Sequence, residues 1–153
     1  MTEHSAWWRV RREELLAVAR ERCPTYIYNE EIINEIFFDM LCVEAMDRPF
    51  YSVSINPYPE IVRKAHEMGV GLLYTSSAEI NGLTDRIPGL ASQRLLFTPR
   101  APSLEDYAYA FDRGDRVVVD DPDAISAYPG IFQGREIFLG LALSPKGSKP
   151  KRL

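Results

Sequence analysis

The chain has 153 residues, of which 46% are hydrophobic and 26% charged, which suits a single domain able to bury a core. Its net charge of −4 gives no electrostatic reason to expect nucleic-acid binding, and no apolar run approaches the ~18 residues of a membrane span. The first residues do not form a signal peptide, so a cytoplasmic location without membrane attachment is expected.

Cysteine and histidine are too sparse for a metal site or a disulfide framework. The two cysteines, Cys23 and Cys42, lack the C-x-x-C spacing, and we expect both to be free thiols. His4 and His66 have no second ligand at metal spacing. The sequence therefore predicts no metal site.

The first elements in chain order are two helices with a short strand between them. Residues 7–22 have the apolar stripe of an amphipathic helix, and residues 24–29 (PTYIYN) alternate like a short strand. A second helix is predicted over residues 30–46, with Asn29 as its capping residue.

Five short apolar runs then recur at regular intervals, with helical patterns between them. The runs begin at residues 50, 71, 94, 116 and 136. This strand–helix repetition predicts a parallel sheet with right-handed crossovers. Because the runs are apolar almost throughout, we expect helices to cover both faces. The short, even units favour an incomplete (β/α) barrel of TIM type, with about five parallel strands and flanking helices, but periodicity leaves an open flat sheet possible.

The predicted helix starts have recognisable capping chemistry. Asn-Pro at residues 56–57 and Asp-Pro at residues 121–122 each place a capping residue before a proline at the first helical position. Residues 76–79 (SSAE) have the pattern of a capping box, and Ser103 begins a weaker one. Gly69 stands where a C-terminal helix glycine is expected.

The segment FYSVSINPYPEIVRKAHEMGVG, residues 50–71, resembles the first barrel strand and helix of fold-type III decarboxylases. These are alanine racemase-like enzymes that use pyridoxal 5'-phosphate (PLP), and their signature there reads Y-A-V-K-A-N-P, with the lysine holding the cofactor as a Schiff base. Other elements follow in the family's order. PTYIYN resembles the strand before the barrel, residues 74–79 resemble V-V-S-G-G-E, residues 117–125 resemble I-N-V-D-S, and residues 141–145 (LALSP) resemble L-R-V-N-P.

The resemblance implies the N-terminal half of a diaminopimelate decarboxylase barrel, truncated and degenerate. It covers residues 24–145, after an amphipathic helix in residues 1–23 and before a disordered basic tail in residues 146–153. The segment WWRVRREELL before the strand is similar to the one that joins the halves of bifunctional aspartate kinase/diaminopimelate decarboxylase proteins.

The sequence departs from the family at the residues that matter for chemistry. The lysine position is Ser54, which cannot form an imine. The acidic residue that precedes V-V-S-G-G-E falls at Leu72, and the arginine and asparagine of L-R-V-N-P fall at Ala142 and Ser144. We therefore expect no catalytic residue and no bound cofactor, although the family's cofactor is PLP.

Glu79 and Asp120 are the two weak candidates for cofactor binding. Both match the family's pattern, as do Asn56 and Ser76, for which helix capping is sufficient explanation. For Glu79, a place in the capping box explains the residue equally well. Asp120 ends a strand on the face where barrel active sites form, but a role in the turn accounts for it too.

Three functional hypotheses follow. The first is an inactive half barrel that acts as a structural or interaction domain. The second is part of a PLP-dependent decarboxylase of lysine biosynthesis, converting meso-diaminopimelate to lysine, completed by missing sequence or another chain. The third is a small-ligand binder that uses the old substrate cleft. A half barrel would leave strand edges uncovered, so we expect a homo-oligomer, with a dimer favoured.

Overall fold

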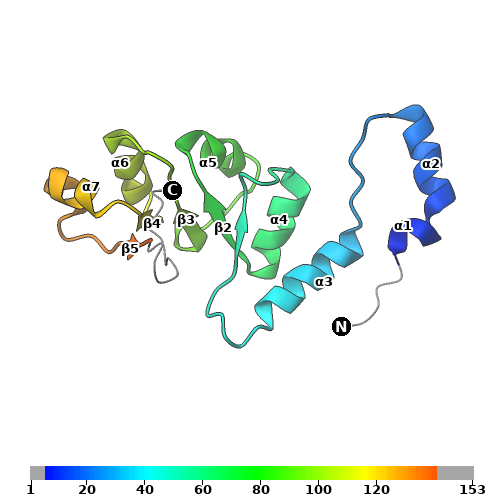
Figure 1. The fold of residues 1–153 in the computed structure, drawn as a ribbon, viewed down its shortest axis with the longest axis horizontal. Helices are drawn as coiled ribbons and strands as arrows, with labels where there is room; N and C mark the ends of the chain where they lie inside the picture. Colours follow the sequence, from blue (N-terminus) through cyan, green and yellow to red (C-terminus); the bar gives the residue numbers. More distant parts are fainter. Residues whose placement is uncertain (1–5, 141–153) are drawn as a thin grey trace, which may run out of the picture. The chain divides into compact units, whose positions relative to one another are not determined.

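The computed structural model describes residues 6–140, and the chain divides into two compact units, residues 1–35 and 36–153 (Figure 1). The expectations for residues 141–145 and for the tail at 146–153 lie outside the described residues. The boundary expected between residues 23 and 24 stays a prediction. None of the helices in residues 6–140 is long and apolar enough to cross a membrane.

The first unit contains α1 (Trp7–Val10), α2 (Arg12–Glu21) and the start of α3 (Glu30–Leu41). The single helix predicted over residues 7–22 is therefore interrupted at Arg11. Arg11 has φ −97° and ψ 22°, and its Nε donates to Glu14 Oε2 at 3.0 Å. Two glutamates in the first turn of α2 favour a new helix start there, because they face the positive end of its dipole.

Residues 24–29 form no strand, so this part of the prediction is wrong. A strand is stable only with a ladder partner, and no strand of the described chain pairs with this segment. The expected cap at Asn29 is confirmed, since its Oδ1 accepts a hydrogen bond from the N–H of Ile32 at 3.1 Å. The helix ends at Leu41 rather than near Met46.

The second unit has a sheet of five parallel strands in the order β1-β2-β3-β4-β5. The strands are β1 (Phe50–Ser52), β2 (Gly71–Tyr74), β3 (Leu95–Phe97), β4 (Arg116–Val119) and β5 (Phe138–Leu139). A doubly wound sheet would reverse its strand order once, whereas a (β/α) barrel keeps the order of the chain. The predicted α/β fold with about five parallel strands, arranged as part of a barrel, is confirmed.

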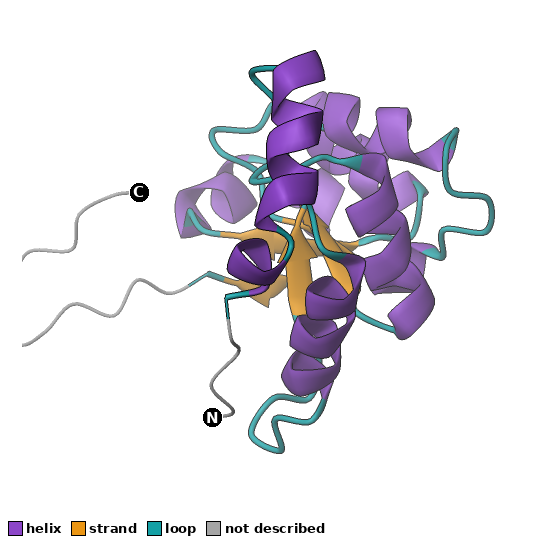
Figure 2. Cartoon of the chain, turned by 90° about the vertical axis from the view of Figure 1, so that its right-hand side faces the viewer, coloured by secondary structure: helices purple, strands orange, loops and turns teal. Residues whose placement is uncertain are grey.

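Helices connect successive strands. They are α4 (Pro59–Met68), α5 (Ser77–Thr84), the short 3-10 helix η1 (Ser92–Arg94), α6 (Leu104–Asp112), α7 (Pro122–Ala127) and α8 (Pro129–Phe132). Figure 1 shows α4, α5 and α6 following one another along the sheet, and Figure 2 shows the strands of the sheet in orange. The predicted C-terminal glycine of α4 is confirmed, because Gly69 has a left-handed φ of 101°.

Burial alternates along the strands, which corrects the expectation that helices cover both faces. One face, here called the helix face, has side chains that are at most 1% exposed: Leu72, Tyr74, Leu95, Phe97, Val117 and Val119. The opposite face, here called the inner face, is half-buried and carries Ser52, Leu73, Leu96, Arg116 and Val118. Right-handed crossovers between neighbouring strands in chain order place every helix on the same side. The inner face is the one that lines the interior of a closed barrel.

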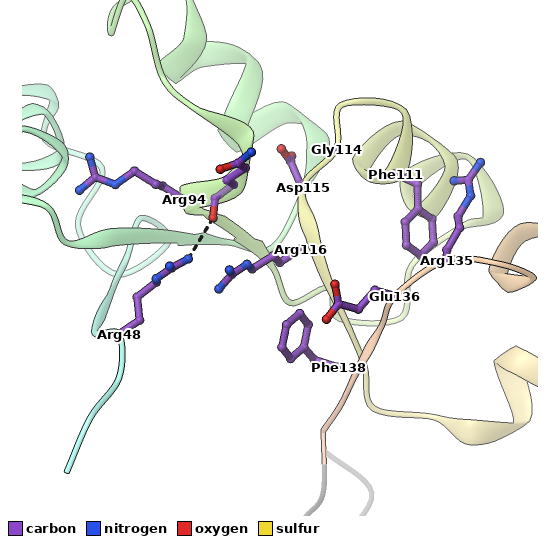
Figure 3. A pocket seen from close by; sticks show the side chains of 10 residues that line it. Arg48, Arg94, Phe111, Gly114, Asp115, Arg116, Arg135, Glu136 and Phe138 are labelled. Carbon is purple, nitrogen blue, oxygen red and sulfur yellow. Dashed lines mark hydrogen bonds between the residues drawn. The ribbon is translucent and has the colours of Figure 1, made fainter.

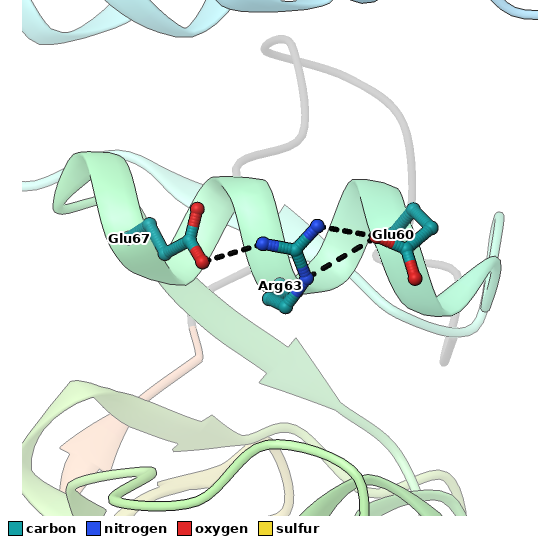
Figure 4. A network of polar contacts seen from close by, with 3 residues as sticks. All are labelled: Glu60, Arg63 and Glu67. Atoms are coloured by element: carbon teal, nitrogen blue, oxygen red, sulfur yellow. Dashed lines mark hydrogen bonds and ion pairs between the residues drawn. The ribbon is translucent and has the colours of Figure 1, made fainter.

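The exposed side of α4 carries a small charged network (Figure 4). Arg63 bonds both Glu60, one turn before it, and Glu67, whose Oε1 lies 2.6 Å from Arg63 Nη1. The pKa of Arg63 is raised by its hydrogen bonds to these two carboxylates. Such solvent-exposed pairs add little stability, so the network serves mainly to neutralise charge on this helix.

The helix face is organised around Tyr74. Its ring stacks on Phe97 with the centroids 4.9 Å apart, and its hydroxyl donates to Asp115 Oδ2 at 2.7 Å. Arg113 Nε donates to the same oxygen at 3.1 Å. Asp115 is the one buried charged residue among those described, and its other oxygen, Oδ1, has no hydrogen-bond partner there. The contact ties β2 to the start of β4 across β3.

We predict that Tyr74→Phe lowers the free energy of unfolding by about 1–3 kcal/mol, because a buried carboxylate loses its hydroxyl donor. Urea denaturation followed by circular dichroism measures the change. Tyr109→Phe is the matched control, because the Tyr109 hydroxyl donates to Asn81 at an exposed position, and a change within about 0.5 kcal/mol is expected there. Equal losses in the two variants would contradict the role given to the buried bond.

A second prediction concerns pH. Burial raises the pKa of the Asp115 carboxyl above its ordinary 3.8, although the hydrogen bonds from Tyr74 and Arg113 oppose the change. A raised pKa means that the folded state holds this proton more tightly than the unfolded chain does. The contribution of the Asp115 carboxyl to the free energy of unfolding is therefore lost as the pH rises above 3.8 and passes through the raised pKa. We expect the stability of the wild type relative to Asp115→Asn to fall over that window, and a flat difference would count against it.

Candidate functional site

The carboxyl ends of the parallel strands meet at one edge of the sheet, where ligand sites form in α/β folds. Ser54 and Asn56 follow β1, Glu79 follows β2 and Asp120 follows β4. The structure thus brings the pattern-matching residues Asn56, Glu79 and Asp120, together with Ser54, to this carboxyl edge. It does not bring Glu79 and Asp120 together, because their strands are two positions apart in the sheet, roughly 10 Å at the usual strand spacing.

Ser54 lies in the turn that follows β1. Val53 before it is 1% exposed, whereas Ser54 is exposed, and its Oγ lies 3.0 Å from Ser52 Oγ. Within residues 6–140 the single lysine is Lys64, which lies on α4 and not at the carboxyl edge. This part of the edge therefore offers no amine, and its residues do not fit a covalently held PLP.

Asn56 does not cap the next helix, contrary to prediction. Tyr58 is the N-cap residue of α4 and Pro59 occupies its first position. The side chain of Asn56 instead turns the loop, with Oδ1 accepting from the N–H of Tyr58 at 3.1 Å. The Tyr51 hydroxyl donates to the Asn56 carbonyl at 3.0 Å and holds this turn against β1.

Glu79 is engaged in the loop after β2. Ser76 is the N-cap of α5, as predicted, and its Oγ accepts from the N–H of Glu79 at 3.3 Å. The Glu79 carboxylate does not return to the backbone of Ser76. It accepts from Thr75 instead, from the N–H at 2.9 Å and from Oγ1 at 2.8 Å. Both carboxylate oxygens are thus used to fix the turn that begins α5.

Asp120 is exposed at the end of β4, and in the described part of the chain its carboxylate makes no hydrogen bond. The neighbouring Asp121 does the capping, as predicted, with its side chain accepting from the N–H of Asp123 at 3.0 Å and Pro122 in the first turn of α7. The pKa of Tyr107 is raised by burial, and the negative charge of Asp120 adds to that effect. Asp120 is the candidate whose carboxylate is available at this edge.

Sequence reasoning missed the polar groups at the opposite, amino-terminal edge of the sheet. A pocket there is lined by Arg48, Gln93, Arg94, Phe111, Gly114, Asp115, Arg116, Arg135, Glu136 and Phe138 (Figure 3). A signal was present in the sequence, because an arginine stands at or just before the start of four of the five apolar runs. The described residues contain no group of three His, Cys, Asp or Glu side chains able to hold a metal ion.

No family model matches the chain. A diaminopimelate decarboxylase of Deinococcus radiodurans is 26% identical over 113 residues, which is 74% of this chain and 29% of that protein. The ornithine decarboxylase of Entamoeba histolytica has a TM-score of 0.69 at 20% identity, over 85% of this chain and 42% of that one. The arginine decarboxylase of Paramecium bursaria Chlorella virus, solved with agmatine, has a TM-score of 0.67 at 17% identity, over 85% and 35%.

These likenesses agree with the resemblance drawn from residues 24–145. The solved structures share the fold, and the sequence match is to a diaminopimelate decarboxylase. The chain spans less than half the length of each of these proteins. It shares with the solved decarboxylases the α/β architecture of part of a barrel.

Proposed function

We propose that this chain is a diaminopimelate decarboxylase-like half barrel that has no decarboxylase activity of its own and acts as a structural or interaction domain. The observation that carries the proposal is Ser54 at the position of the Schiff-base lysine. A PLP enzyme needs an amine there to hold the aldehyde and to orient the cofactor. Lys64, the single lysine among residues 6–140, belongs to a connecting helix.

The position of the family's acidic residue supports the same conclusion. Leu72 is fully buried in β2 on the helix face, beneath the connecting helices and away from the carboxyl edge. Of the two weak candidates for cofactor binding, Glu79 is occupied by Thr75 and only Asp120 has an available carboxylate. One carboxylate does not bind a phosphate or an aldehyde.

The inner face and β5 support a role in interaction. Leu73, Leu96 and Val118 are only half-buried on the inner face, and in β5 Phe138 and Leu139 are 40% and 55% exposed. Within residues 6–140, β5 pairs on one side only, with β4. An apolar face next to an unpaired strand edge favours association with another chain. A second copy related by two-fold symmetry is the commonest solution.

The alternative is part of a PLP-dependent decarboxylase of lysine biosynthesis, acting on meso-diaminopimelate and completed by further sequence or another chain. The observation in its favour is the 26% identity to a diaminopimelate decarboxylase of which this chain covers 29%. Ser54 distinguishes the two proposals. In the alternative, the further sequence or the other chain would have to supply the amine that Ser54 does not provide.

We predict that PLP added to the purified 153-residue chain forms no specific covalent adduct. Absorbance titration, borohydride reduction and peptide mass spectrometry measure this. Scattered low-level labelling of several surface lysines is the expected result. Stoichiometric labelling of one defined lysine would contradict the proposal and favour the alternative.

Ser54→Lys is the companion variant. It restores an amine but not the acidic group at Leu72, and each missing electrostatic contact typically costs about 10² or more in rate. We expect no release of carbon dioxide from diaminopimelate above background in this variant supplied with PLP. Measurable release would show that the carboxyl edge retains a working site.

We also predict that the chain is a dimer at micromolar concentration, measured by light scattering after size exclusion. Leu139→Lys on β5 should shift the protein toward a monomer, because a charge would lie on the exposed strand. Leu104→Lys is the matched control, since Leu104 is 40% exposed on α6 and should leave the dimer intact. A monomeric wild type that binds no hydrophobic dye would refute the interaction surface.

A further inference from the structure

The amino-terminal edge of the sheet holds a pocket of about 580 Å³, on the side opposite the carboxyl edge. Arg48 precedes β1, Arg94 precedes β3, Arg116 opens β4, and Arg135 and Glu136 precede β5. Residues far apart in the sequence meet here because the strands are parallel and start at the same edge. Pockets that bind small molecules commonly have about 300–1,000 Å³, so the volume suits such a ligand.

The lining carries an excess of positive charge although the whole chain has a net charge of −4. The residues of the lining include four arginines and two carboxylates, Asp115 and Glu136. Asp115 is already held by Tyr74 and Arg113 on the helix face. The other carboxylate of the lining, Glu136, is bound by neither Tyr74 nor Arg113.

Two of the arginines have donors to spare. Arg48 gives one hydrogen bond, from Nη1 to the Gln93 carbonyl at 3.2 Å, and Arg116 lies 5.9 Å from the centre of the Phe138 ring. Neither forms an ion pair with any carboxylate of residues 6–140. Figure 3 shows these two side chains extending toward each other. Arg63 on α4, which is bracketed by two glutamates, shows the contrasting neutralised arrangement.

The rest of the lining includes two aromatic rings, Phe111 and Phe138, and the hydrogen-bond acceptor Glu136. Phe138 is 40% exposed beside Arg116, and Phe111 lies under Arg135, whose guanidinium carbon is 4.6 Å from the ring centre. Arg135 also reaches Asp112 at 3.7 Å, so it is partly neutralised. Glu136 can accept a hydrogen bond from a ligand hydroxyl or amine.

We propose that this amino-edge pocket binds a small phosphorylated molecule, with the phosphate held by Arg48 and Arg116 and its apolar part against Phe138. A phosphate monoester carries about −1.5 to −2 charge at pH 7 and three acceptor oxygens, which matches two forked guanidinium groups better than one carboxylate does. The site is separate from the carboxyl edge, so it holds or fails independently of the proposed loss of decarboxylase activity, and it shares Arg116 and Phe138 with the proposed interaction surface.

Isothermal titration of the purified chain with pyrophosphate and with adenosine monophosphate, in 150 mM NaCl, tests the proposal. We expect one site per chain with a dissociation constant below about 1 mM. Arg48→Gln and Arg116→Gln should each weaken binding at least about tenfold. Arg86→Gln is the matched control, since Arg86 is an exposed arginine outside the pocket, and it should leave the affinity unchanged.

Glu136→Gln provides a test in the opposite direction. Removing a negative charge from the lining should tighten phosphate binding several-fold, a result that a loss of folding cannot imitate. Succinate at the same concentration should bind at least about tenfold more weakly than pyrophosphate, because each carboxylate carries less charge. The proposal is overturned by no binding at 150 mM NaCl, by equal weakening in Arg86→Gln, by succinate binding as tightly, or by unchanged affinity in Glu136→Gln.

Discussion

The hydrogen bond from Tyr74 to Asp115 is the contact on which the sheet depends. It joins the second strand to the start of the fourth across the third, while the Tyr74 ring stacks on Phe97 of the strand between them. The ring of Tyr107 on α6 meets the ring of Phe97 edge-on, with the centroids 6.2 Å apart, so the same aromatic group also contacts a connecting helix. A buried carboxylate is costly unless it is paired, so the bond to Asp115 favours the register that keeps β2 and the start of β4 in place.

The parallel order of the strands divides the polar chemistry of the domain between two edges. The carboxyl edge, where barrel enzymes place their catalytic groups, has Ser54 after its first strand and uses Glu79 to fix its own loop. The amino-terminal edge gathers arginines from four strand starts and has few carboxylates to balance them. Positive charge available to bind a ligand thus lies at the amino-terminal edge, whereas the residues that resemble the decarboxylase family lie at the carboxyl edge.

Three of the four residues that match the decarboxylase pattern form hydrogen bonds that stabilise loops of the fold. Ser76 caps α5, and Glu79 and Thr75 close the turn before it. Asn56 turns the loop into α4, held by the hydroxyl of Tyr51. These contacts stabilise the strand ends whether or not a cofactor is present.

The sequence by itself determined the strand–helix alternation, the parallel sheet and most helix starts, because these depend on local periodicity and capping at residues such as Ser76, Ser103 and Asp121. It could not show that residues 24–29 lack a strand partner, since pairing is a property of the whole sheet. Only the tertiary structure decided that the helices share one face, that Asp115 is buried beneath Tyr74, and that Arg48 and Arg116 meet at one pocket. Those facts depend on which strands become neighbours, and neighbours in the sheet are distant in the chain.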